Sequence, residues 1–579
     1  MNVTAMEAAS DVETRLRLVL GQRVHSDLGS RALFTSDASL YRVLPALVVE
    51  PADVDELAAV VRICGETGTP LHMRGAGTSI AGNALGAGVV VATRSLARIV
   101  ELDSGQGYAV VEPGVVLDDL NAAAEAHGLR VGPDPSTHSR CTLGGMIGNN
   151  ACGAHSVVWG TTAQNILGLD VIRADGTHVR LTSPGAPARP ADPDWPELDG
   201  PLAYELRAFT ASHEELIRRE LPAWPRRVSG YALDWLLPER GPDHAKALVG
   251  TEGTCAVVAR AVVRLVRPPA ARALLVLGFR DEIEGADAVP ALLTAEPYTV
   301  ESLSAELLAL AHARAKDVGL PDGGAWLMVE ARAQDAAGAR THARALAASI
   351  GRTLDAPDVR LIEDPPALAA LWQIREDGAG HSARFADGTR GWPGFEDSAV
   401  PPERLGAYLT ELRALLAEHG MQAVSYGHYG EGCIHLRVGF GLGEAGGASR
   451  YARFLSDAAD LVVRHGGSLS GEHGDGRSRG PLLGRQFSPE LIEAFATFRR
   501  TWDPDGVLNP AVIVEPPDVT DDCPTTWQAA PFVVAIEAID TISGVASIDV
   551  TVTAPSSGVT TMSVARDRSA PSTSPPVTA

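Results

Sequence analysis

The spacing of apolar residues predicts that strands and helices alternate along the first half of the chain. Residues 47–62, LVVEPADVDELAAVVR, have the pattern of a short strand, a turn and a helix. Asp53 stands where a helix cap is expected, and Glu56 follows three residues later, as in a capping box. Runs such as GAGVVVATRSL and YAVVEPGVVLDDL predict further strands and a helix. This α+β pattern continues to about residue 268, where the strand-like CAVVARAVVRLV ends.

A second region, from 269 to 500, combines strand-like runs such as ALLVLGF, AWLMVEARA and CIHLRVGF with helical runs such as ARALAASIG. We therefore expect an α+β domain with an antiparallel sheet that helices cover. Residues 1–29 predict an N-terminal helix, 30–268 a first domain, and 501–517 a segment that returns to this domain. From 518 to 579 Thr, Ser, Ala, Val and Pro dominate, which predicts a low-complexity, disordered tail. One run in it, PFVVAIEAIDTISGVASIDVTVTA, could form strands, and the tail is either an appended segment or the product of a reading-frame change.

Composition and charge argue against several classes of function. The chain has 579 residues, of which 45% are hydrophobic and 21% charged, as in folded proteins of two or more domains. Acidic residues outnumber basic ones by 72 to 49, which argues against nucleic acid as a partner. The six cysteines form no CxxC pair, so neither an iron–sulfur cluster nor a Cys-type zinc site is expected. No run predicts a signal peptide or a transmembrane segment, and we expect a cytoplasmic protein, with peripheral membrane association left open.

A glycine-rich run, RGAGTSIAG at 74–82, follows the strand-like TPLHM. Its glycines allow the backbone to approach a ligand closely, and the exposed N–H groups of such a turn bind anions. Its hydroxyls and its arginine add donors and positive charge. A purely structural turn explains this run alone equally well. The residues expected to contact a cofactor here are Arg74, Gly75, Ala76, Gly77, Thr78, Ser79 and Gly82.

Three further segments favour a bound flavin. The run GPDPSTHSRCTLGGMIGNNACG, at 132–153, is rich in Gly, Asn and small hydroxyl residues. Ordering such a run costs conformational entropy, which a bound ligand would offset. LVGTEGTCAVV at 248–258 and LNP at 508–510 have a similar character. The residues expected at the cofactor in these segments are Ser136, Thr142, Gly144, Gly145, Asn149, Gly153, Glu252, Gly253, Val257 and Asn509.

Two short motifs carry candidate metal ligands. YGHYGEGCIHLRVG contains His428 and His435, and SGEHGDG contains Glu472 and His473. A spacing of seven on one strand would put the first two imidazoles on opposite faces, so the glycines between them suggest a loop that enters a strand. Two imidazoles and a carboxylate would leave open positions on Zn²⁺ or Mn²⁺. Alone, these motifs suggest a metal-dependent hydrolase, or histidines with a structural role.

The ordered set of motifs resembles a known family. RGAGTS, TLGGMIGNNACG, ILGLDVIRADG and GTEGT resemble the FAD-binding region of the vanillyl-alcohol oxidase/PCMH superfamily. LWQIRED, GHYGEGCIH, SGEHGDG and DPDGVLNP resemble its D-2-hydroxyacid dehydrogenase branch, which includes D-lactate, D-2-hydroxyglutarate and glycolate dehydrogenases. The resemblance covers roughly 30–515 and implies an α+β fold, with a two-subdomain PCMH-type FAD-binding domain and a cap domain over the flavin ring. Some members of the branch continue into an iron–sulfur domain, and this chain resembles the flavin half of such fusions.

The resemblance implies FAD-dependent oxidation of a D-2-hydroxyacid to the 2-oxoacid. It assigns His428, His435 and Glu472 to a divalent metal, with zinc as the expected ion, which clamps the 2-hydroxyl and the 1-carboxylate of the substrate. His473 is then the natural general base, because the ordinary pKa of an imidazole, about 6.5, suits proton transfer at neutral pH. The hydroxyl proton would pass to this base and a hydride from Cα to flavin N5. Orienting Glu472 is the alternative role of His473.

The FAD is expected to be noncovalent. Relatives that attach the flavin use a His or Cys near the pyrophosphate loop or in the cap, and neither type occurs between Arg74 and Asn83. His138 and His155 are the nearest alternatives, and a structural role is the more common one for each.

Substrate recognition is expected to involve two arginines. Arg375 in LWQIRED matches the carboxylate-binding arginine of the branch, although pairing with a neighbouring carboxylate is the structural alternative. Arg437 stands where many relatives carry Asn, and Phe395 and Glu396 stand where some carry a Lys for the distal carboxylate. We therefore expect Arg437 to bind the distal carboxylate of a dicarboxylate. D-lactate or a larger 2-hydroxyacid remains open.

The partner that takes the electrons is expected to be an iron–sulfur protein, an electron-transfer flavoprotein or a quinone. Two other functions remain open. One is a flavin oxidase that passes electrons directly to O₂. The other is a flavin-binding electron-transfer subunit without substrate oxidation of its own, against which the intact metal and base motifs argue.

Overall fold

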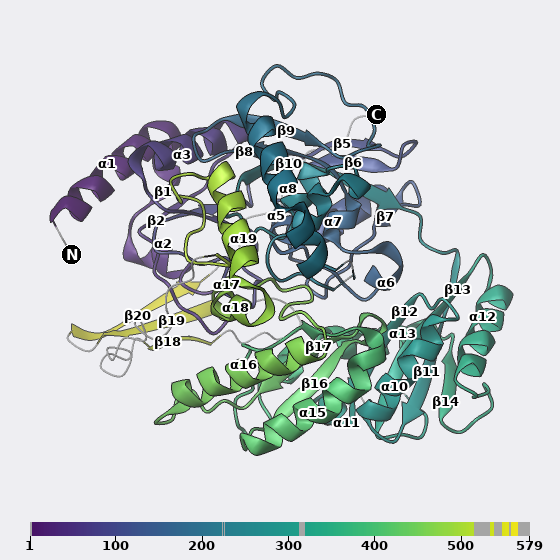
Figure 1. Ribbon diagram of the computed structural model, residues 1–579. Coiled ribbons are helices and arrows are strands. Elements are labelled where there is room, and N and C mark those ends of the chain that lie inside the picture. The colour runs from purple at the N-terminus through teal and green to yellow at the C-terminus, as the bar shows by residue number, and fades with distance from the viewer. Residues whose placement is uncertain are drawn as a thin grey trace. The chain divides into compact units, whose positions relative to one another are not determined.

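The computed structural model describes residues 3–222, 224, 226–311 and 319–514, together with three strands between 533 and 565. The chain divides into two units, Met1–Pro516 and Pro517–Ala579. Within the first unit, two smaller sheets form the upper part and a larger sheet with its helices forms the lower part (Figure 1).

The first sheet holds the strand that leads into the glycine-rich run. Its order is β1-β2-β4-β3, with β2, β3 and β4 parallel. Asp53 caps the helix at 54–67 by accepting from Glu56 N, as the sequence predicts. Leu16, Leu57 and Val91 belong to the apolar core that joins this helix to the sheet. The elements are α1 (Val3–Leu20), η1 (Gly21–Arg23), β1 (Val24–His25), α2 (Leu28–Ala32), β2 (Leu47–Val49), α3 (Val54–Thr67), β3 (Leu71–Arg74) and β4 (Val89–Ala92).

The second sheet runs β5-β6-β10-β8-β9, and β7 pairs with β10. Its long central strand β10 is the predicted CAVVARAVVRLV run, and it ends at Val266. The elements are β5 (Ile99–Asp103), β6 (Tyr108–Val111), α4 (Leu117–Glu125), β7 (Arg130–Val131), α5 (Leu143–Asn149), α6 (Ser156–Trp159), α7 (Thr162–Asn165), β8 (Ile166–Ile172), β9 (His178–Thr182), α8 (Gly200–Glu220), η2 (Leu233–Leu236), η3 (Pro238–Arg240), α9 (His244–Ala247) and β10 (Val257–Val266).

The third sheet has the order β14-β11-β13-β12-β16-β17-β15, and every neighbouring pair is antiparallel. This is the antiparallel cap sheet that the sequence predicts. The elements of this region are β11 (Ala271–Phe279), α10 (Glu282–Leu293), β12 (Thr299–Ser304), α11 (Ala305–Leu310), β13 (Ala325–Ala333), α12 (Ala336–Ser349), β14 (Val359–Ile362), α13 (Pro365–Glu376), α14 (Gly378–His381), β15 (Ser398–Ala399), η4 (Pro402–Arg404), α15 (Leu405–Glu418), β16 (Ala423–His428), η5 (Tyr429–Glu431), β17 (Cys433–Val438) and α16 (Gly447–Arg464).

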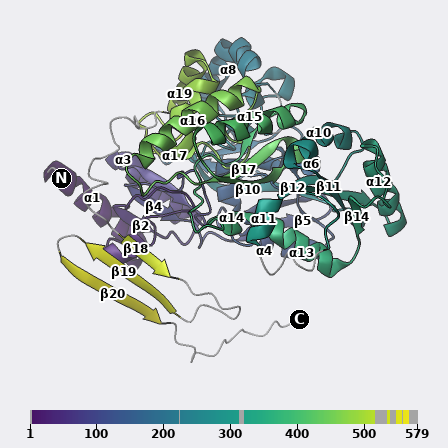
Figure 2. The same cartoon turned by 90° about the horizontal axis from the view of Figure 1, so that it is seen from below.

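Helices cover both faces of the cap sheet. Successive side chains of a strand point to opposite faces, and the strands carry apolar side chains on both. Leu275 and Leu277 of β11 belong to the core cluster that contains α10 and α12. Leu274 and Val276 belong to a separate cluster with residues of α11 and α13. Figure 2 shows α15 and α16 on one side of these strands and α11, α13 and α14 on the other.

The chain returns to the first sheet after the cap. Helix α19 (Pro489–Trp502) packs on α8 of the first half of the chain, with the rings of Phe209 and Phe498 5.7 Å apart. Leu71 of β3 then donates to Val507 O, and Asn509 N donates to Leu71 O. Between the cap and α19 lie α17 (Gly476–Arg479), η6 (Gly480–Leu482) and α18 (Leu483–Gln486).

The second unit contains strands of its own. β18 (Val533–Glu537), β19 (Ser547–Ala554) and β20 (Ser557–Ala565) form an antiparallel sheet. The predicted strand-forming run supplies the first two, and each finds its partner within this unit. The rest of 518–579 lies outside the described residues, so its disorder stays a prediction.

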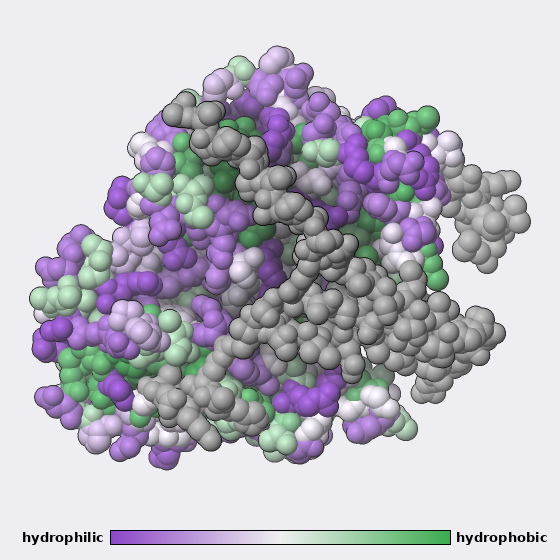
Figure 3. All heavy atoms as spheres, turned by 180° about the vertical axis from the view of Figure 1, so that it is seen from behind, coloured by the Kyte–Doolittle hydropathy of each residue, from purple (hydrophilic) through white to green (hydrophobic). Residues whose placement is uncertain are grey.

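The surface is mostly polar on the face shown in Figure 3, where apolar residues form smaller patches. Among the residues whose burial is described, the large apolar side chains with the greatest exposure include Leu18, Leu33 and Tyr204. No helix in the described part of the chain is both long and apolar enough to cross a bilayer.

Candidate functional site

A cavity lies where the first half of the chain meets the cap, and the glycine-rich run forms part of its wall. Strand β3 ends at Arg74, and residues 75–80 turn along the cavity. Gly77 has φ +71°, a conformation that favours glycine, and a Cβ at Gly75 would overlap the hydroxyl of Thr142. Within the described chain, the N–H groups of 76–79 donate to no acceptor, and the buried Ser79 Oγ has no partner. These unpaired donors fit the anionic pyrophosphate of a dinucleotide.

The second predicted flavin segment contributes a short helix to the same wall. Thr142 caps α5 by accepting from Gly145 N at 3.3 Å. A Cβ at Gly144 would lie 2.6 Å from Pro113 Cβ, so only glycine allows this close approach. The predicted cofactor residues that line the cavity are Gly75, Ala76, Gly77, Thr78, Ser79, Ser136, Thr142, Gly144, Gly145, Asn149, Glu252 and Gly253.

Five residues predicted at the cofactor are not among those that line the cavity. Arg74 turns away, and its Nη2 donates to Ser36 O at 2.8 Å. Asn509 donates to Asn83 O and Glu252 O and so holds two lining segments from behind.

Close packing explains why the other three residues do not face the cavity. Gly82 approaches the ring of Tyr41, and Gly153 packs against the backbone of Asp134. Val257 is fully buried in the core of the first sheet. The sequence could not tell which residues of these segments face the cavity.

Neither histidine considered for covalent flavin attachment lines the cavity. His138 Nδ1 lies 2.8 Å from Asp118 Oδ1. His155 pairs through Nδ1 with Asp134 and through Nε2 with Glu330 of the cap, at 3.0 Å. Burial lowers the pKa of His155, but the two carboxylates outweigh burial and raise it to about 9. Both histidines therefore have structural partners, and noncovalent FAD stays a prediction.

The two histidines of the first metal motif lie on a hairpin. Strand β16 ends at His428, η5 turns the chain, and Gly432 has φ +70° before β17 begins. The register pairs His428 with Cys433 and Tyr426 with His435. This register puts His428 and His435 at diagonal positions on one face of the antiparallel pair, and their imidazole centroids are 5.0 Å apart. The loop entering a strand that the sequence suggested is thus a hairpin, which brings the imidazoles together despite their spacing of seven.

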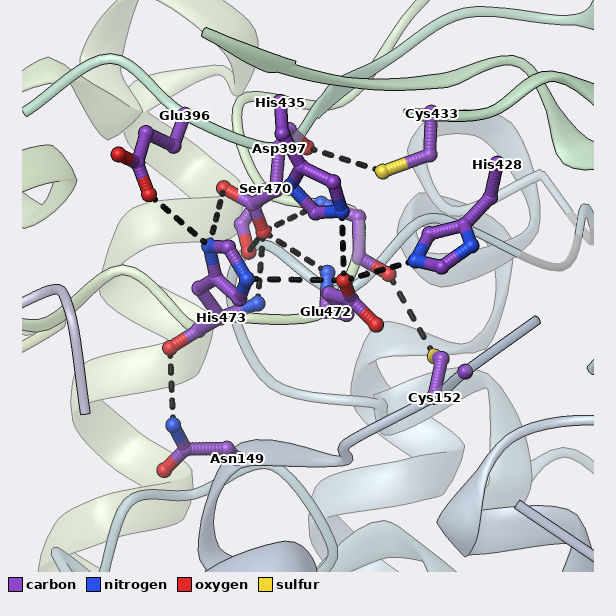
Figure 4. A network of polar contacts seen from close by, with 12 residues as sticks. Asn149, Cys152, Glu396, Asp397, His428, Cys433, His435, Ser470, Glu472 and His473 are labelled. Carbon is purple, nitrogen blue, oxygen red and sulfur yellow. Dashed lines mark hydrogen bonds and ion pairs between the residues drawn. The ribbon is translucent and has the colours of Figure 1, made fainter. Parts of the chain in front are cut away.

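Glu472 meets both histidines from a separate segment. Its Oε1 lies 3.2 Å from His428 Nε2 and 3.0 Å from His435 Nε2. One ligand-type atom from each of the three residues lies within 4.8 Å of the others. His473 Nε2 is 3.5 Å from the same oxygen, and Figure 4 shows the three imidazoles around Glu472. All four side chains line the cavity.

The charge distribution of this cluster favours a cation. Burial raises the pKa of Glu472, but His428 and Arg226 outweigh burial and hold it well below its usual range. Burial lowers the pKa of His435 to about 3, so this imidazole is neutral and available as a ligand. Burial also lowers the pKa of His428, but Glu301 and Glu472 raise it above its ordinary value. These carboxylates favour a positive charge at this point, and the donor set of two imidazoles and one carboxylate suits zinc.

Arg226 fixes the second oxygen of Glu472. This arginine is fully buried, and its Nη1 donates to Glu472 Oε2 at 3.1 Å. Its Nε donates to Glu431 Oε2 and its Nη2 to Gly153 O. Because Oε2 is occupied in this way, Oε1 is the oxygen of Glu472 that faces the histidines.

Asp397 holds the backbone that carries Glu472 and His473. Its Oδ2 accepts from Gly471 N at 3.1 Å, Glu472 N at 2.9 Å and His473 N at 2.6 Å. Its Oδ1 pairs with Arg479 at 2.6 Å and lies 3.6 Å from His473 Nδ1. Asp397 has φ +60°, a conformation that is uncommon for residues other than glycine. Surrounding contacts must therefore stabilise it. The loop is therefore held independently of the His473 imidazole.

The two predicted substrate arginines occupy different environments. Arg375 lines the cavity and is buried, and its Nε has no partner in the described chain. Arg437 lies behind the wall, where its Nε is 2.7 Å from Glu396 Oε1. The glutamate that replaces the lysine of some relatives thus pairs with the arginine expected to compensate for it.

Several residues that shape the site were not identified from the sequence. Glu301, Arg226 and Asp397 are buried and contact the candidate ligands or their loop. Each comes from a segment that resembles ordinary strand or loop sequence. The one hint that the sequence offers is that Glu301 is the only charged residue in the strand-like run YTVESLS.

Family comparisons agree with this geometry. A family profile described as "FAD binding domain" matches residues 45–182, and one described as "FAD linked oxidases, C-terminal domain" matches 268–513. The chain belongs to the FAD-linked oxidases. The FAD-binding profile covers both the glycine-rich run on the cavity wall and the segment 132–153.

The names of several curated relatives refer to hydroxyacids. D-2-hydroxyglutarate dehydrogenase of Pantoea ananatis is 28% identical over 512 residues, which cover 84% of this chain and 50% of that protein. The chain therefore spans about half the length of that relative. Glycolate oxidase subunit GlcD of Bacillus subtilis is 26% identical, over 86% of this chain and 96% of that protein. D-lactate dehydrogenase of Archaeoglobus fulgidus is 28% identical, over 81% and 91%.

Solved structures have a similar fold. p-Cresol methylhydroxylase superposes with a TM-score of 0.61 over 87% of this chain and 96% of that one, at 14% identity. 4-Ethylphenol oxidase from Gulosibacter chungangensis gives the same TM-score over 88% and 98%, also at 14% identity. These likenesses support the predicted PCMH-type α+β fold.

Proposed function

We propose that this FAD-linked oxidoreductase oxidises a D-2-hydroxyacid to the 2-oxoacid at a site that holds a divalent metal. One observation carries the proposal. His428, His435, Glu472 and His473 come together on the wall of the cavity that the FAD-binding loop also lines. A metal and a flavin in one cavity suit oxidation of a chelating alcohol better than hydrolysis by metal-bound water.

The residues divide the chemistry between them. Bound zinc would supply Lewis acidity to the substrate hydroxyl, and bound FAD would supply the acceptor for two electrons and a hydrogen. His428, His435 and Glu472 hold the metal. Arg375 directs its free Nε edge at the substrate carboxylate, where a guanidinium binds well. His473 would accept the proton of the substrate hydroxyl.

The relatives' names support D-2-hydroxyglutarate, D-lactate and glycolate as candidate substrates. The ion pair between Arg437 and Glu396 weakens the case for Arg437 as a second carboxylate-binding residue. We keep both monocarboxylates and dicarboxylates in the proposal. The electron acceptor, for which we propose an iron–sulfur protein, an electron-transfer flavoprotein or a quinone, and the cytoplasmic location stay predictions.

Turnover with an artificial electron-accepting dye separates this proposal from the two alternatives. We expect the FAD- and zinc-loaded protein to reduce the dye with at least one D-2-hydroxyacid, and to form hydrogen peroxide much more slowly in air. Peroxide formation as fast as dye reduction would favour the oxidase. Flavin that chemical reductants reduce but no hydroxyacid reduces would favour the electron-transfer subunit.

A further inference from the structure

A buried carboxylate of the cap sheet joins the metal candidates to the substrate arginine. Glu301 lies on β12 and is 1% exposed. Its Oε1 is 2.8 Å from His428 Nδ1, and its Oε2 is 2.6 Å from Arg375 Nη2. The two oxygens of one side chain thus contact a proposed metal ligand and the proposed substrate-binding residue.

This contact determines the tautomer of His428. A carboxylate with one oxygen on a guanidinium is ionised and only accepts hydrogen bonds, so His428 Nδ1 must carry the hydrogen. The lone pair of a neutral ring then lies on Nε2, the nitrogen 3.2 Å from Glu472 Oε1. Arg375 Nη2 also approaches His428 Nδ1, at 3.5 Å, but the carboxylate is much closer and decides the tautomer.

The second oxygen of Glu301 holds the guanidinium of Arg375. This contact uses Nη2 of Arg375. The Nε atom has no partner in the described chain, and the Arg375 side chain lines the cavity. Arg375 also lies over the ring of Tyr426, with Cζ 5.1 Å from the centroid. These two contacts restrict the position of the guanidinium.

We propose that Glu301 is a positioning residue that selects Nε2 of His428 as the metal-binding nitrogen and orients Arg375 toward the substrate carboxylate. The proposal rests on the proposed function for the identity of both partners. Histidines that bind metals commonly donate their other N–H to a carboxylate, and loss of such a partner typically costs about 10–100-fold in metal affinity or activity. A buried ion pair without this role would leave metal affinity unchanged when it is lost.

Glu301→Gln tests the tautomer directly. Glutamine has the same shape but offers one acceptor oxygen and one NH₂ group. If the oxygen stays on Arg375, the NH₂ donates to His428 Nδ1 and places the hydrogen on Nε2, which then cannot bind a metal. We expect the affinity for Zn²⁺, measured by competition with a chromophoric chelator, to fall about 10–100-fold. FAD content should stay at the wild-type value, and the KM for the hydroxyacid should rise as Arg375 loses its anionic partner.

Glu330→Gln is the matched control. Glu330 is fully buried on the neighbouring strand β13 and pairs with His155, away from the metal candidates. This substitution should cost stability similarly but leave Zn²⁺ affinity within about twofold. Equal Zn²⁺ affinity in Glu301→Gln and the wild type would overturn the proposal, as would wild-type protein that binds no Zn²⁺.

A second variant keeps the test decisive if Glu301→Gln folds poorly. Glu301→Asp retains a carboxylate, which only accepts hydrogen bonds, so this variant should bind Zn²⁺ more tightly than Glu301→Gln does. Equal losses of Zn²⁺ affinity in both variants would contradict the tautomer argument. The Zn²⁺ measurement does not depend on catalysis. If no hydroxyacid reduces the flavin while these affinities behave as expected, the proposed reaction fails and the role of Glu301 toward the metal stands.

Discussion

Replacing His473 with alanine is expected to leave FAD bound but to slow reduction of the flavin by substrate by about 10²–10⁴-fold, the usual contribution of a general base. The backbone of this residue is held by Asp397 Oδ2 on one side and by Asn149 Nδ2, at 2.9 Å, on the other. Removal of the imidazole therefore leaves the loop and the neighbouring Glu472 in place. Stopped-flow absorbance under nitrogen measures the rate, and the visible spectrum measures retained FAD.

Metal content separates the two roles open to His473. A base that does not bind the metal can be removed with zinc content unchanged, whereas a residue that orients Glu472 would take zinc with it. His419→Ala is a suitable control, because His419 lies on the cap and pairs with the exposed Asp457. Flavin reduction in His473→Ala within about threefold of the wild-type rate would refute its role as base.

The substitution His435→Ala is expected to cost metal and activity together. Its Nε2 lies 3.0 Å from Glu472 Oε1, and burial holds the pKa of the imidazole at about 3, so the ring is neutral and ready to bind a cation. Loss of a residue that only supports a metal ligand typically costs about 10–100-fold in metal affinity. Loss of a ligand itself should therefore cost at least about 100-fold. Metal analysis after dialysis and anaerobic flavin reduction should both fall, while FAD stays bound by the other half of the chain.

His155→Ala gives the matched control for this loss. Both histidines are 5% exposed, but the partners of His155 are Asp134 and Glu330 rather than the metal candidates. The control should lose stability and keep its zinc. Unchanged zinc in His435→Ala would remove this residue from the ligand set.

Local patterns in the sequence predicted the elements that build the site. The capped helix after Asp53, the strand before the glycine-rich run and the antiparallel cap sheet all follow from short-range apolar spacing and turn residues. The convergence of His428, His435 and Glu472 did not follow from spacing. It depends on the hairpin register and on a loop 44 residues from His428.

The contacts that adjust the site could not be predicted, because they join segments far apart in the chain. Arg226 reaches Glu472 across 246 positions, and Glu301 reaches His428 across 127. The pairing of Arg437 with Glu396 changed the expected role of that arginine in the same way. A sequence shows which residues carry charge, but packing decides which charges neutralise one another.

The absorbance of the bound flavin, followed anaerobically after addition of a 2-hydroxyacid to FAD- and zinc-loaded protein, tests the central claim most directly. The proposed function predicts that D-lactate, D-2-hydroxyglutarate or glycolate bleaches the flavin, that the L enantiomers of the first two do not, and that a chelator slows the bleaching. No bleaching by any of these acids, with FAD and metal both present, would contradict it.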